Sequence, residues 1–223
     1  SNDAYEEIFQ EIDTTGLVEK KGIIYIWTKK NLKSRNLEIK VRKEFGIEQK
    51  LLTQKEVLEL EPNLQPVFDA GVIYESAMHA RDPHGILKKI FKLYLDRGGK
   101  FVQTNIKNLE QINNNETAIR SENEEYKFEK TVVASGAFSK LLTDQLGENI
   151  PLDTERGYHV HFKGKDHLIS RPVIFLDRGF GMTPMNQGLR AVGTVELGGL
   201  NNPSSKKRID YIIKCAKELL PDL

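Results

Sequence analysis

The feature that most constrains the fold is an alternation of apolar and polar residues in the last third of the chain. Apolar Tyr158, Val160 and Phe162 alternate with polar His159, His161 and Lys163. A period of two is typical of a strand with one buried face and one exposed face. Strand-like segments follow at residues 172–177, 180–184 and 189–197, and a tight Asn-Gln-Gly turn at 186–188 precedes the last of them. The pattern predicts a sheet that is mixed but largely antiparallel.

Helix signals flank these strands. Thr53 and Glu56 form a capping-box pattern, in which the hydroxyl and the carboxylate satisfy N–H groups at the start of a helix. Asp82-Pro83 predicts a second helix start, with an apolar stripe over residues 86–94 and Gly98-Gly99 at its end. Further helices are expected over residues 3–12, over 29–45 and after Pro203. Helices and strands in this order, without an internal repeat, predict an α+β fold.

The middle of the chain carries short strand-like segments, at residues 100–104, 106–112, 117–121 and 126–134. Polar turns at 113–115 and 122–124 separate the last three, which predicts a three-stranded meander. The last segment continues into residues 131–139 (Thr-Val-Val-Ala-Ser-Gly-Ala-Phe-Ser), where a predicted buried strand ends in small residues before a short helix. Small residues let a ligand approach the backbone, and a helix N-terminus offers free N–H groups to phosphate. An ordinary strand-to-helix turn would have the same pattern.

The charge balance narrows the class of function. The 223 residues include 33 Lys and Arg against 32 Asp and Glu, a formal net charge of +1. This balance argues against a general nucleic-acid binder and favours a small-molecule site. The single Cys215 excludes an internal disulfide, and no stretch approaches about 18 consecutive apolar residues, the length of a membrane helix. A cytoplasmic setting is expected, with a peripheral contact at the inner membrane left open.

Five segments together carry a resemblance to a known family. They are residues 80–83 (Ala-Arg-Asp-Pro), 131–139, 156–158 (Arg-Gly-Tyr), 181–196 and 216–221. In this order they resemble elements of the D-amino-acid oxidase superfamily of FAD-dependent oxidoreductases, and glycine-oxidase-like members and bacterial D-amino-acid dehydrogenases are similar in pattern. The family's Gly-x-Gly-x-x-Gly turn is not found, since Gly179-Phe180-Gly181 has a hairpin context. The family's later Gly-x-Arg-Pro segment, which carries the arginine for the substrate carboxylate, is not found either.

The resemblance implies an organisation for the chain. Residues 1–78 and 151–223 would form two parts of a substrate-binding domain, a largely antiparallel sheet flanked by helices. Residues 79–150 would be a portion of the FAD-binding domain that includes the meander. On this interpretation the chain is an internal portion of a longer flavoprotein. We expect it by itself to retain little FAD, to be inactive, and to self-associate through uncovered apolar surface.

The resemblance also implies a reaction. The parent protein would oxidise the C–N bond of D-amino acids or related amines by hydride transfer to FAD, with a quinone or oxygen as the final electron acceptor. Positioning of the substrate is the main catalytic requirement of such a step, so no catalytic residue is assigned. A non-catalytic ligand-binding or interaction module with the same sheet is the alternative.

Candidate site residues follow from the resemblance. The substrate side comprises Phe180, Gly181, Met182 and Glu196, although an exposed strand residue is an equal interpretation of Glu196. The flavin side comprises Ala134, Ser135, Gly136 and Phe138. His159 and His161 lie on one strand face as a metal pair would, but no third ligand is evident nearby, so no metal site is predicted.

Overall fold

The computed structural model describes residues 2–113 and 115–223, and it divides into two compact units. The first unit contains the residues up to Gly98 together with Gly157–Val195 and Ser204–Leu223. The second contains Gly99–Arg156 and Glu196–Pro203. Each unit is therefore assembled from segments that are distant in sequence. Whether they correspond to substrate-binding and FAD-binding domains stays a prediction.

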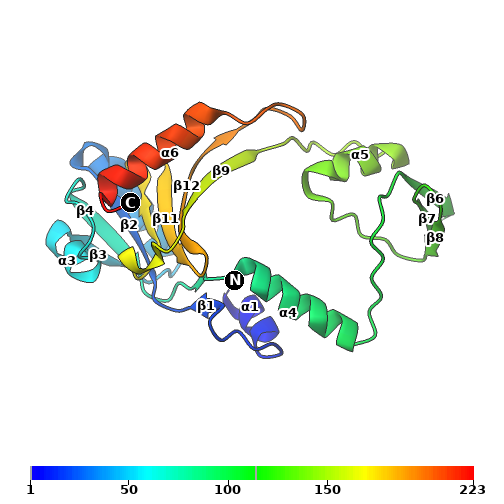
Figure 1. Ribbon diagram of the computed structural model, residues 1–223, viewed down its shortest axis with the longest axis horizontal. Coiled ribbons are helices and arrows are strands. Elements are labelled where there is room, and N and C mark those ends of the chain that lie inside the picture. The colour runs from blue at the N-terminus through cyan, green and yellow to red at the C-terminus, as the bar shows by residue number, and fades with distance from the viewer. Residues whose placement is uncertain (1, 114) are drawn as a thin grey trace. The chain divides into compact units, whose positions relative to one another are not determined.

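A seven-stranded sheet is the centre of the first unit (Figure 1). In spatial order its strands are β3 (Lys50–Thr53), β4 (Ala70–Tyr74), β2 (Ile23–Trp27), β10 (Val173–Phe175), β11 (Phe180–Met185), β12 (Gly188–Glu196) and β9 (Arg156–Phe162). β2 and β10 pair in parallel, whereas the β3–β4, β2–β4, β10–β11 and β11–β12 pairs are antiparallel. The mixed, largely antiparallel sheet is confirmed.

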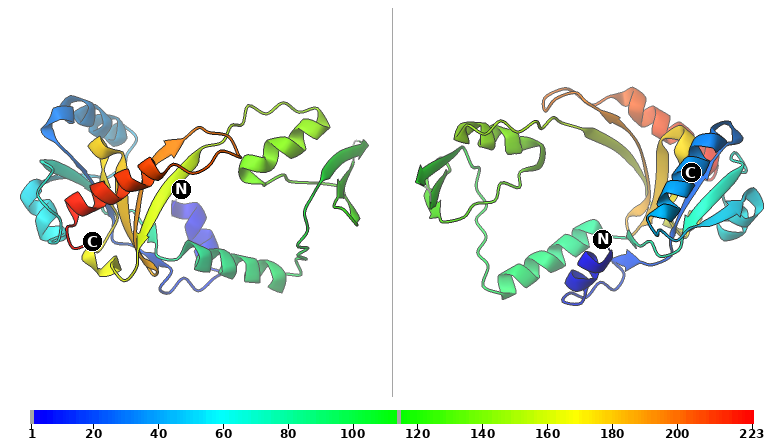
Figure 2. Two further views of the ribbon diagram at one scale, coloured as in Figure 1. Left: turned by 45° about the horizontal axis from the view of Figure 1, so that its top comes forward. Right: turned by 180° about the vertical axis from the view of Figure 1, so that it is seen from behind.

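Helices and two short strands complete the first unit. They are α1 (Asn2–Phe9), β1 (Val18–Glu19), η1 (Lys29–Asn31), α2 (Leu32–Glu44), α3 (Gln54–Leu60), β5 (His79–Ala80), α4 (Pro83–Asp96), η4 (Asp166–Leu168), η5 (Leu176–Arg178) and α6 (Lys206–Leu219). β1 and β5 pair as a separate two-stranded sheet, and α1 and α4 lie side by side in the views of Figures 1 and 2. None of the helices among the described residues is both long and apolar enough to cross a bilayer.

The core of the first unit lies between the sheet and α6. Met182 and Leu189 are fully buried in one cluster with Ile212 and Ala216 of α6. Burying one such large side chain contributes roughly 1.5–3 kcal/mol, so this cluster fixes both the helix and the hairpin beneath it. In both views of Figure 2, α6 lies beside the strands of this sheet.

Two predicted helix starts are confirmed by their hydrogen bonds. The Thr53 side chain accepts from the Glu56 N–H, and the Glu56 carboxylate accepts from the Thr53 N–H at 2.8 Å. At the start of α4, the Asp82 carboxylate accepts from the Gly85 N–H at 2.9 Å, with Pro83 in the first helical position. Both caps satisfy N–H groups that have no partner inside the helix.

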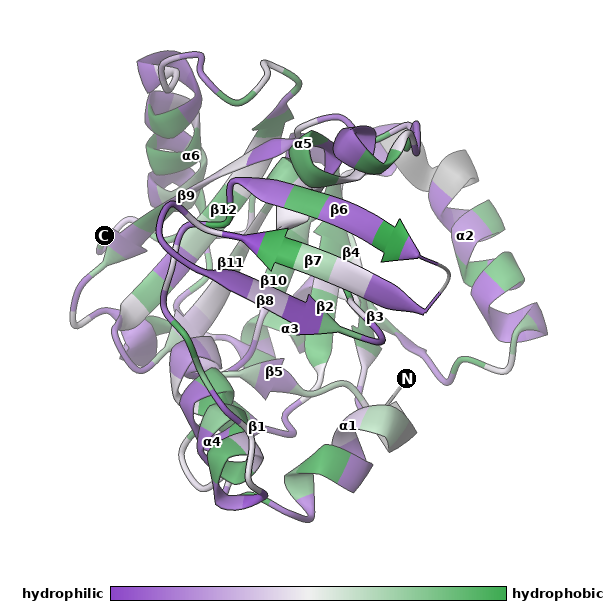
Figure 3. Cartoon of the chain, turned by 90° about the vertical axis from the view of Figure 1, so that its right-hand side faces the viewer, coloured by the Kyte–Doolittle hydropathy of each residue, from purple (hydrophilic) through white to green (hydrophobic). Residues whose placement is uncertain are grey.

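The second unit is a small meander with short helices. It contains β6 (Asn108–Asn113), β7 (Glu116–Arg120), β8 (Glu125–Phe128), η2 (Gly136–Phe138), α5 (Ser139–Thr143) and η3 (Asp144–Leu146). The three strands pair antiparallel in sequence order, so the meander is confirmed. Asn114 in its first turn lies outside the described residues. Figure 3 shows hydrophobic and hydrophilic residues interspersed along these strands.

Two strand predictions in this unit are wrong. Residues 100–104 and 131–134 form no strand, and Val132 is 88% exposed although it was expected to be buried. The reason is that a strand requires a partner for its backbone groups, and no described strand pairs with either segment. The predicted apolar stripe of α4 is also exposed, at Leu87, Phe91 and Tyr94.

Candidate functional site

A hollow of about 640 Å³ lies in the first unit, over β9, β11 and β12. Its lining includes Gly157, His159, Thr183, Arg190 and Val192. Strand register explains why these residues meet: Thr183 pairs with Arg190, and β9 is the neighbour of β12 on its other side. We call this hollow the sheet pocket.

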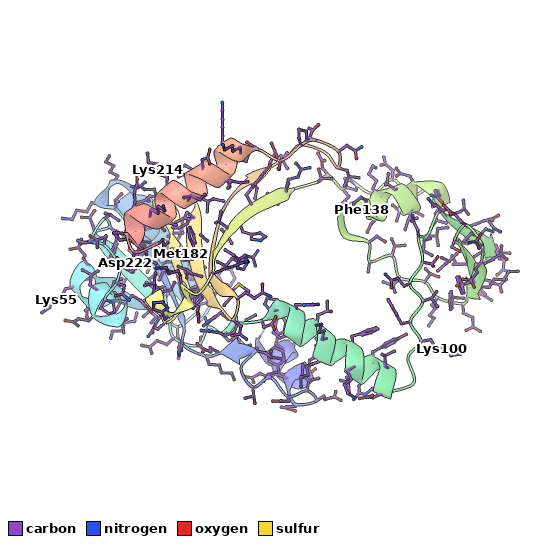
Figure 4. All side chains as sticks on the ribbon, viewed as in Figure 1. Lys55, Lys100, Phe138, Met182, Lys214 and Asp222 are labelled. Atoms are coloured by element: carbon purple, nitrogen blue, oxygen red, sulfur yellow. The ribbon has the colours of Figure 1, made fainter. Side chains whose placement is uncertain are left out.

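The two faces of the β11–β12 hairpin differ because side chains alternate along a strand. Phe180 and Met182 are 2% and 0% exposed and belong to the core that α6 covers. Their neighbour Gly181 pairs with Val192, which lines the sheet pocket. Of these three predicted substrate residues, only Gly181 therefore lies at a register position of the pocket face. Figure 4 shows Met182 within the sheet.

Gly181 leaves little room for a side chain. A Cβ at this position would collide with Cδ1 of Ile174 on the adjacent β10. A Cβ at Gly193 would lie 2.8 Å from the Gly179 carbonyl oxygen, which is backbone and cannot move aside easily. Close packing against backbone therefore requires a glycine at 193, whereas at 181 the obstacle is the end of a flexible side chain.

The pocket face is cationic. Arg190 and His159 belong to the lining, and the lining includes no carboxylate. The rings of His159 and His161 meet edge to face, with centroids 5.2 Å apart. Burial lowers the pKa of His161 below its usual value of 6.5, and the nearby His159 and Arg190 lower it further. The three groups are therefore close enough to interact electrostatically.

Several polar atoms on this face have no hydrogen-bond partner among the described residues. They are Arg190 Nε, His161 Nδ1 and Thr194 Oγ1, all of them buried. A buried polar group without a partner costs roughly 1–3 kcal/mol, so a ligand that supplies partners would recover that cost. Thr194 also has φ of +58°, the one positive φ of a residue other than glycine among the described residues. Strained backbone of this kind is concentrated at functional sites.

Glu196, the last residue of β12, is assigned to the second unit, whereas the other predicted substrate residues belong to the first. Its carboxylate is 3.7 Å from the guanidinium of Arg156, which belongs to the same unit. Their pairing explains how a carboxylate is accommodated at the end of β12.

The predicted flavin-side residues also belong to the second unit. Ala134, Ser135, Gly136 and Phe138 are all exposed, and Phe138 is labelled in Figure 4 at the start of the short helical segment. Gly136 has φ of +56°, and no atom lies within 4 Å of where its Cβ would be. The open backbone fits the approach of a flat ring or a phosphate. Residues 131–134 beside it are outside any strand, so their N–H groups are not committed to a ladder.

Metal binding has no support beyond the histidine pair. No group of three or more potential ligands from His, Cys, Asp and Glu gathers within residues 2–113 and 115–223.

Arg190, Thr183 and Thr194 are pocket residues that sequence reasoning missed. The alternation of Leu189 and Ala191 with Arg190 and Val192 is the signal that could have found them. It places charged Arg190 on the strand face opposite the buried apolar Leu189 and Ala191.

Comparison with known families decides the relationship. All of residues 1–223 match the family described as FAD dependent oxidoreductase (DAO). The chain belongs to this family. Its relatives therefore use FAD, and the resemblance seen in the five sequence segments is confirmed.

Individual relatives agree with this assignment. The chain is 30% identical over 219 residues to a D-amino-acid oxidase of Bradyrhizobium diazoefficiens, covering 98% of this chain and 52% of the relative. It is 25% identical over 219 residues to a D-amino acid dehydrogenase of Granulibacter bethesdensis, covering 94% and 52%. The glycine oxidase structure from Geobacillus kaustophilus superposes with a TM-score of 0.84 at 18% identity, covering 99% of this chain and 60% of that one. The chain thus spans about half the length of the curated relatives it matches and has the fold of the family.

Proposed function

We propose that the parent protein oxidises the C–N bond of a D-amino acid or a related amine, with FAD as the hydride acceptor. Membership of the FAD-dependent family and the names of two relatives, a D-amino-acid oxidase and a D-amino acid dehydrogenase, support this proposal. The structural observation that carries it is the sheet pocket, which has the size of a small-ligand site and a cationic lining without carboxylates. A small carboxylate-bearing molecule suits that lining.

The exposed segment that ends at Phe138 would hold part of the FAD. Ala134, Ser135, Gly136 and Phe138 are exposed, and Gly136 leaves its backbone open. When bound, the cofactor supplies the hydride acceptor: the Cα–H bond of the substrate breaks, and the nitrogen lone pair forms the C=N bond. The chain's own contribution is to position the substrate.

Positioning would come from the rigid pocket face of the sheet. Gly181, Thr183 and Val192 form a surface that the antiparallel ladder and the core beneath hold in place. Phe180 and Met182 would act from the core side by fixing the hairpin. A misplacement of about 1 Å can cost about 100-fold in rate, so a strand pair is a suitable support. Glu196, paired with Arg156, is retained as a substrate-side candidate.

Anaerobic reduction of the full-length flavoprotein tests the proposal. We expect a yellow protein whose absorbance bleaches on addition of a D-amino acid, and reoxidation by oxygen or by a quinone then identifies the acceptor. Val192→Trp, which fills the sheet pocket, should slow bleaching at least about tenfold, whereas Lys55→Gln on α3 should not. Lys55 is a suitable control because it is exposed and outside the pocket lining (Figure 4). A full-length protein that holds FAD but is reduced by no amine contradicts the proposal.

A further inference from the structure

Arg190 is a charged side chain in the lining of the sheet pocket, and it has no polar partner among the described residues. It forms no ion pair and no hydrogen bond with the described residues, and its Nε is buried without a partner. In contrast, Arg81 pairs with Asp166 at 2.9 Å, and Arg171 pairs with Glu61 at 3.0 Å. An arginine with a partly buried fork and no protein acceptor is a ready binding group for a carboxylate.

Two histidines extend the same cationic surface. His159 lines the sheet pocket, and its ring contacts that of His161 on the same face of β9. Both His159 and Arg190 act electrostatically on His161, and Nδ1 of His161 is also buried without a partner. A neutral imidazole donates from one ring nitrogen and accepts at the other, so the two rings add hydrogen-bonding groups beside the charged guanidinium of Arg190.

The position of this cluster distinguishes two kinds of carboxylate. An α-carboxylate lies beside the nitrogen of its own amino acid, and the guanidinium of Arg190 would oppose that nitrogen while it carries a proton. A carboxylate at the far end of a side chain is separated from the ammonium and can approach the cluster alone. Arg190 lies two residues along β12 from Val192, about 7 Å at a strand's rise of about 3.4 Å per residue. The side chain of a glutamate-sized substrate spans a distance of this order.

We propose that Arg190, with His159 and His161, forms a subsite for a second, distal carboxylate of the substrate, so that the preferred substrates are acidic amino acids or other carboxylate-bearing amines. This inference rests on the proposed function for the position of the reacting carbon. The binding of an anion at Arg190 does not depend on it, and the two can therefore fail separately.

Binding to the full-length flavoprotein tests the subsite without turnover. Isothermal titration calorimetry would use glutarate, its neutral analogue glutaramide and inorganic phosphate. Glutaramide tests whether the charge is needed, and phosphate tests whether another anion binds as well. We expect glutarate to bind and glutaramide not to bind. Arg190→Gln should weaken glutarate binding about tenfold or more, as loss of a charge-assisted fork predicts. Arg190→Lys should recover part of the loss, and Lys55→Gln, which removes one exposed positive charge from α3, should change nothing.

The histidines provide a second readout. Glutarate should bind more tightly as the pH is lowered and His161, whose pKa is held below 6.5, takes up a proton; His161→Asn should reduce this dependence. Equal binding of glutarate by the parent and Arg190→Gln proteins would overturn the subsite. Tighter binding of phosphate than of glutarate would overturn its assignment to a carboxylate.

Kinetics separate this inference from the proposed function. With D-glutamate and D-glutamine as substrates of the full-length enzyme, Arg190→Gln should lower the ratio of their kcat/KM values about tenfold. D-alanine, which has no distal group, should still reduce the flavin of the variant. An enzyme that bleaches with D-alanine but shows no preference for D-glutamate refutes the subsite alone. A protein that binds glutarate through Arg190 and is reduced by no amine refutes the proposed function alone.

Discussion

The two units of the chain bury very different amounts of apolar surface. The first contains a continuous cluster between the seven-stranded sheet, α3 and α6. In the second, the buried apolar residues among those described are Leu109 and Ala118, while Val132 and Phe138 are exposed. Since apolar burial is the main favourable contribution to folding, the first unit should be the stable one. The apolar surface of the second is available for a cofactor or a partner.

Truncation of a core residue should show the largest difference between the units. Met182→Ala removes a fully buried side chain beneath α6 and should lower the free energy of unfolding by about 2–5 kcal/mol. Val132→Ala in the second unit should change it by less than about 0.5 kcal/mol, because Val132 is already exposed. Denaturant titration of both variants measures the two values. Equal losses would mean that Val132 is buried in solution.

Substitution of one glycine in each unit compares how tightly the two backbones are packed. Gly188 has φ of +123°, and a Cβ there would collide with the carbonyl oxygen of Phe162, so Gly188→Ala should cost roughly 2 kcal/mol or more. Gly136 has positive φ but open space around it, so Gly136→Ala should cost only about 1 kcal/mol. Denaturation midpoints give both costs. If Gly136→Ala were the more damaging change, the open backbone proposed to face FAD would be packed instead.

The sequence predicted the features that short-range physics determines. The caps at Thr53 and Asp82 depend on residues within one helical turn, and the hairpin around residue 187 depends on its own turn and alternation. The exposed segment 131–134 could not be predicted in the same way. Its apolar residues suggest a buried strand, but strand formation depends on a pairing partner, which a local pattern does not specify.

The pocket residues show a second limit of prediction from sequence: a local pattern does not say which face of a strand is buried. A period of two says that Phe180 and Met182 share a face and that Gly181 lies on the other, but it does not say which face the core occupies. That choice depends on α6, which supplies Ile212 and Ala216 from far along the chain. Arg190 and His159 likewise come together through the pairing of β12 with β9, which no local pattern specifies.

Near neutral pH, the free energy of unfolding of the first unit should depend on pH, whereas that of the second should not. All five histidines of the chain are in that unit, at positions 79, 84, 159, 161 and 167. His79 is 8% exposed, and burial lowers its pKa below 6.5; Arg81 and Lys21 add to the lowering, while Glu19 opposes it. In the window just below pH 6.5 the unfolded chain therefore binds more protons than the folded one, and stability falls as the pH decreases through it.

His79→Gln should flatten this dependence, whereas His84→Gln, at an exposed site on α4, should leave it unchanged. Thermal melting between pH 5 and 7.5, a range chosen to bracket about 6.5, measures the slope. If His79→Gln left the slope intact, the effect would be assigned to His161, a half-buried imidazole whose pKa is lowered in the same direction.

Val132→Asp should have the smallest effect on stability. It is also the most direct test of what the exposed surface of the second unit does. The side chain is 88% exposed, so the free energy of unfolding should change by less than about 0.5 kcal/mol. If uncovered apolar surface of this unit drives self-association, the charge should shift sedimentation of the 223-residue chain toward monomer. Leu87→Asp on the exposed stripe of α4 is the matched change in the first unit. Association that Leu87→Asp abolishes and Val132→Asp leaves intact would assign the association surface to the first unit, because both changes place a charge on an exposed apolar residue, 62% exposed at Leu87 and 88% at Val132.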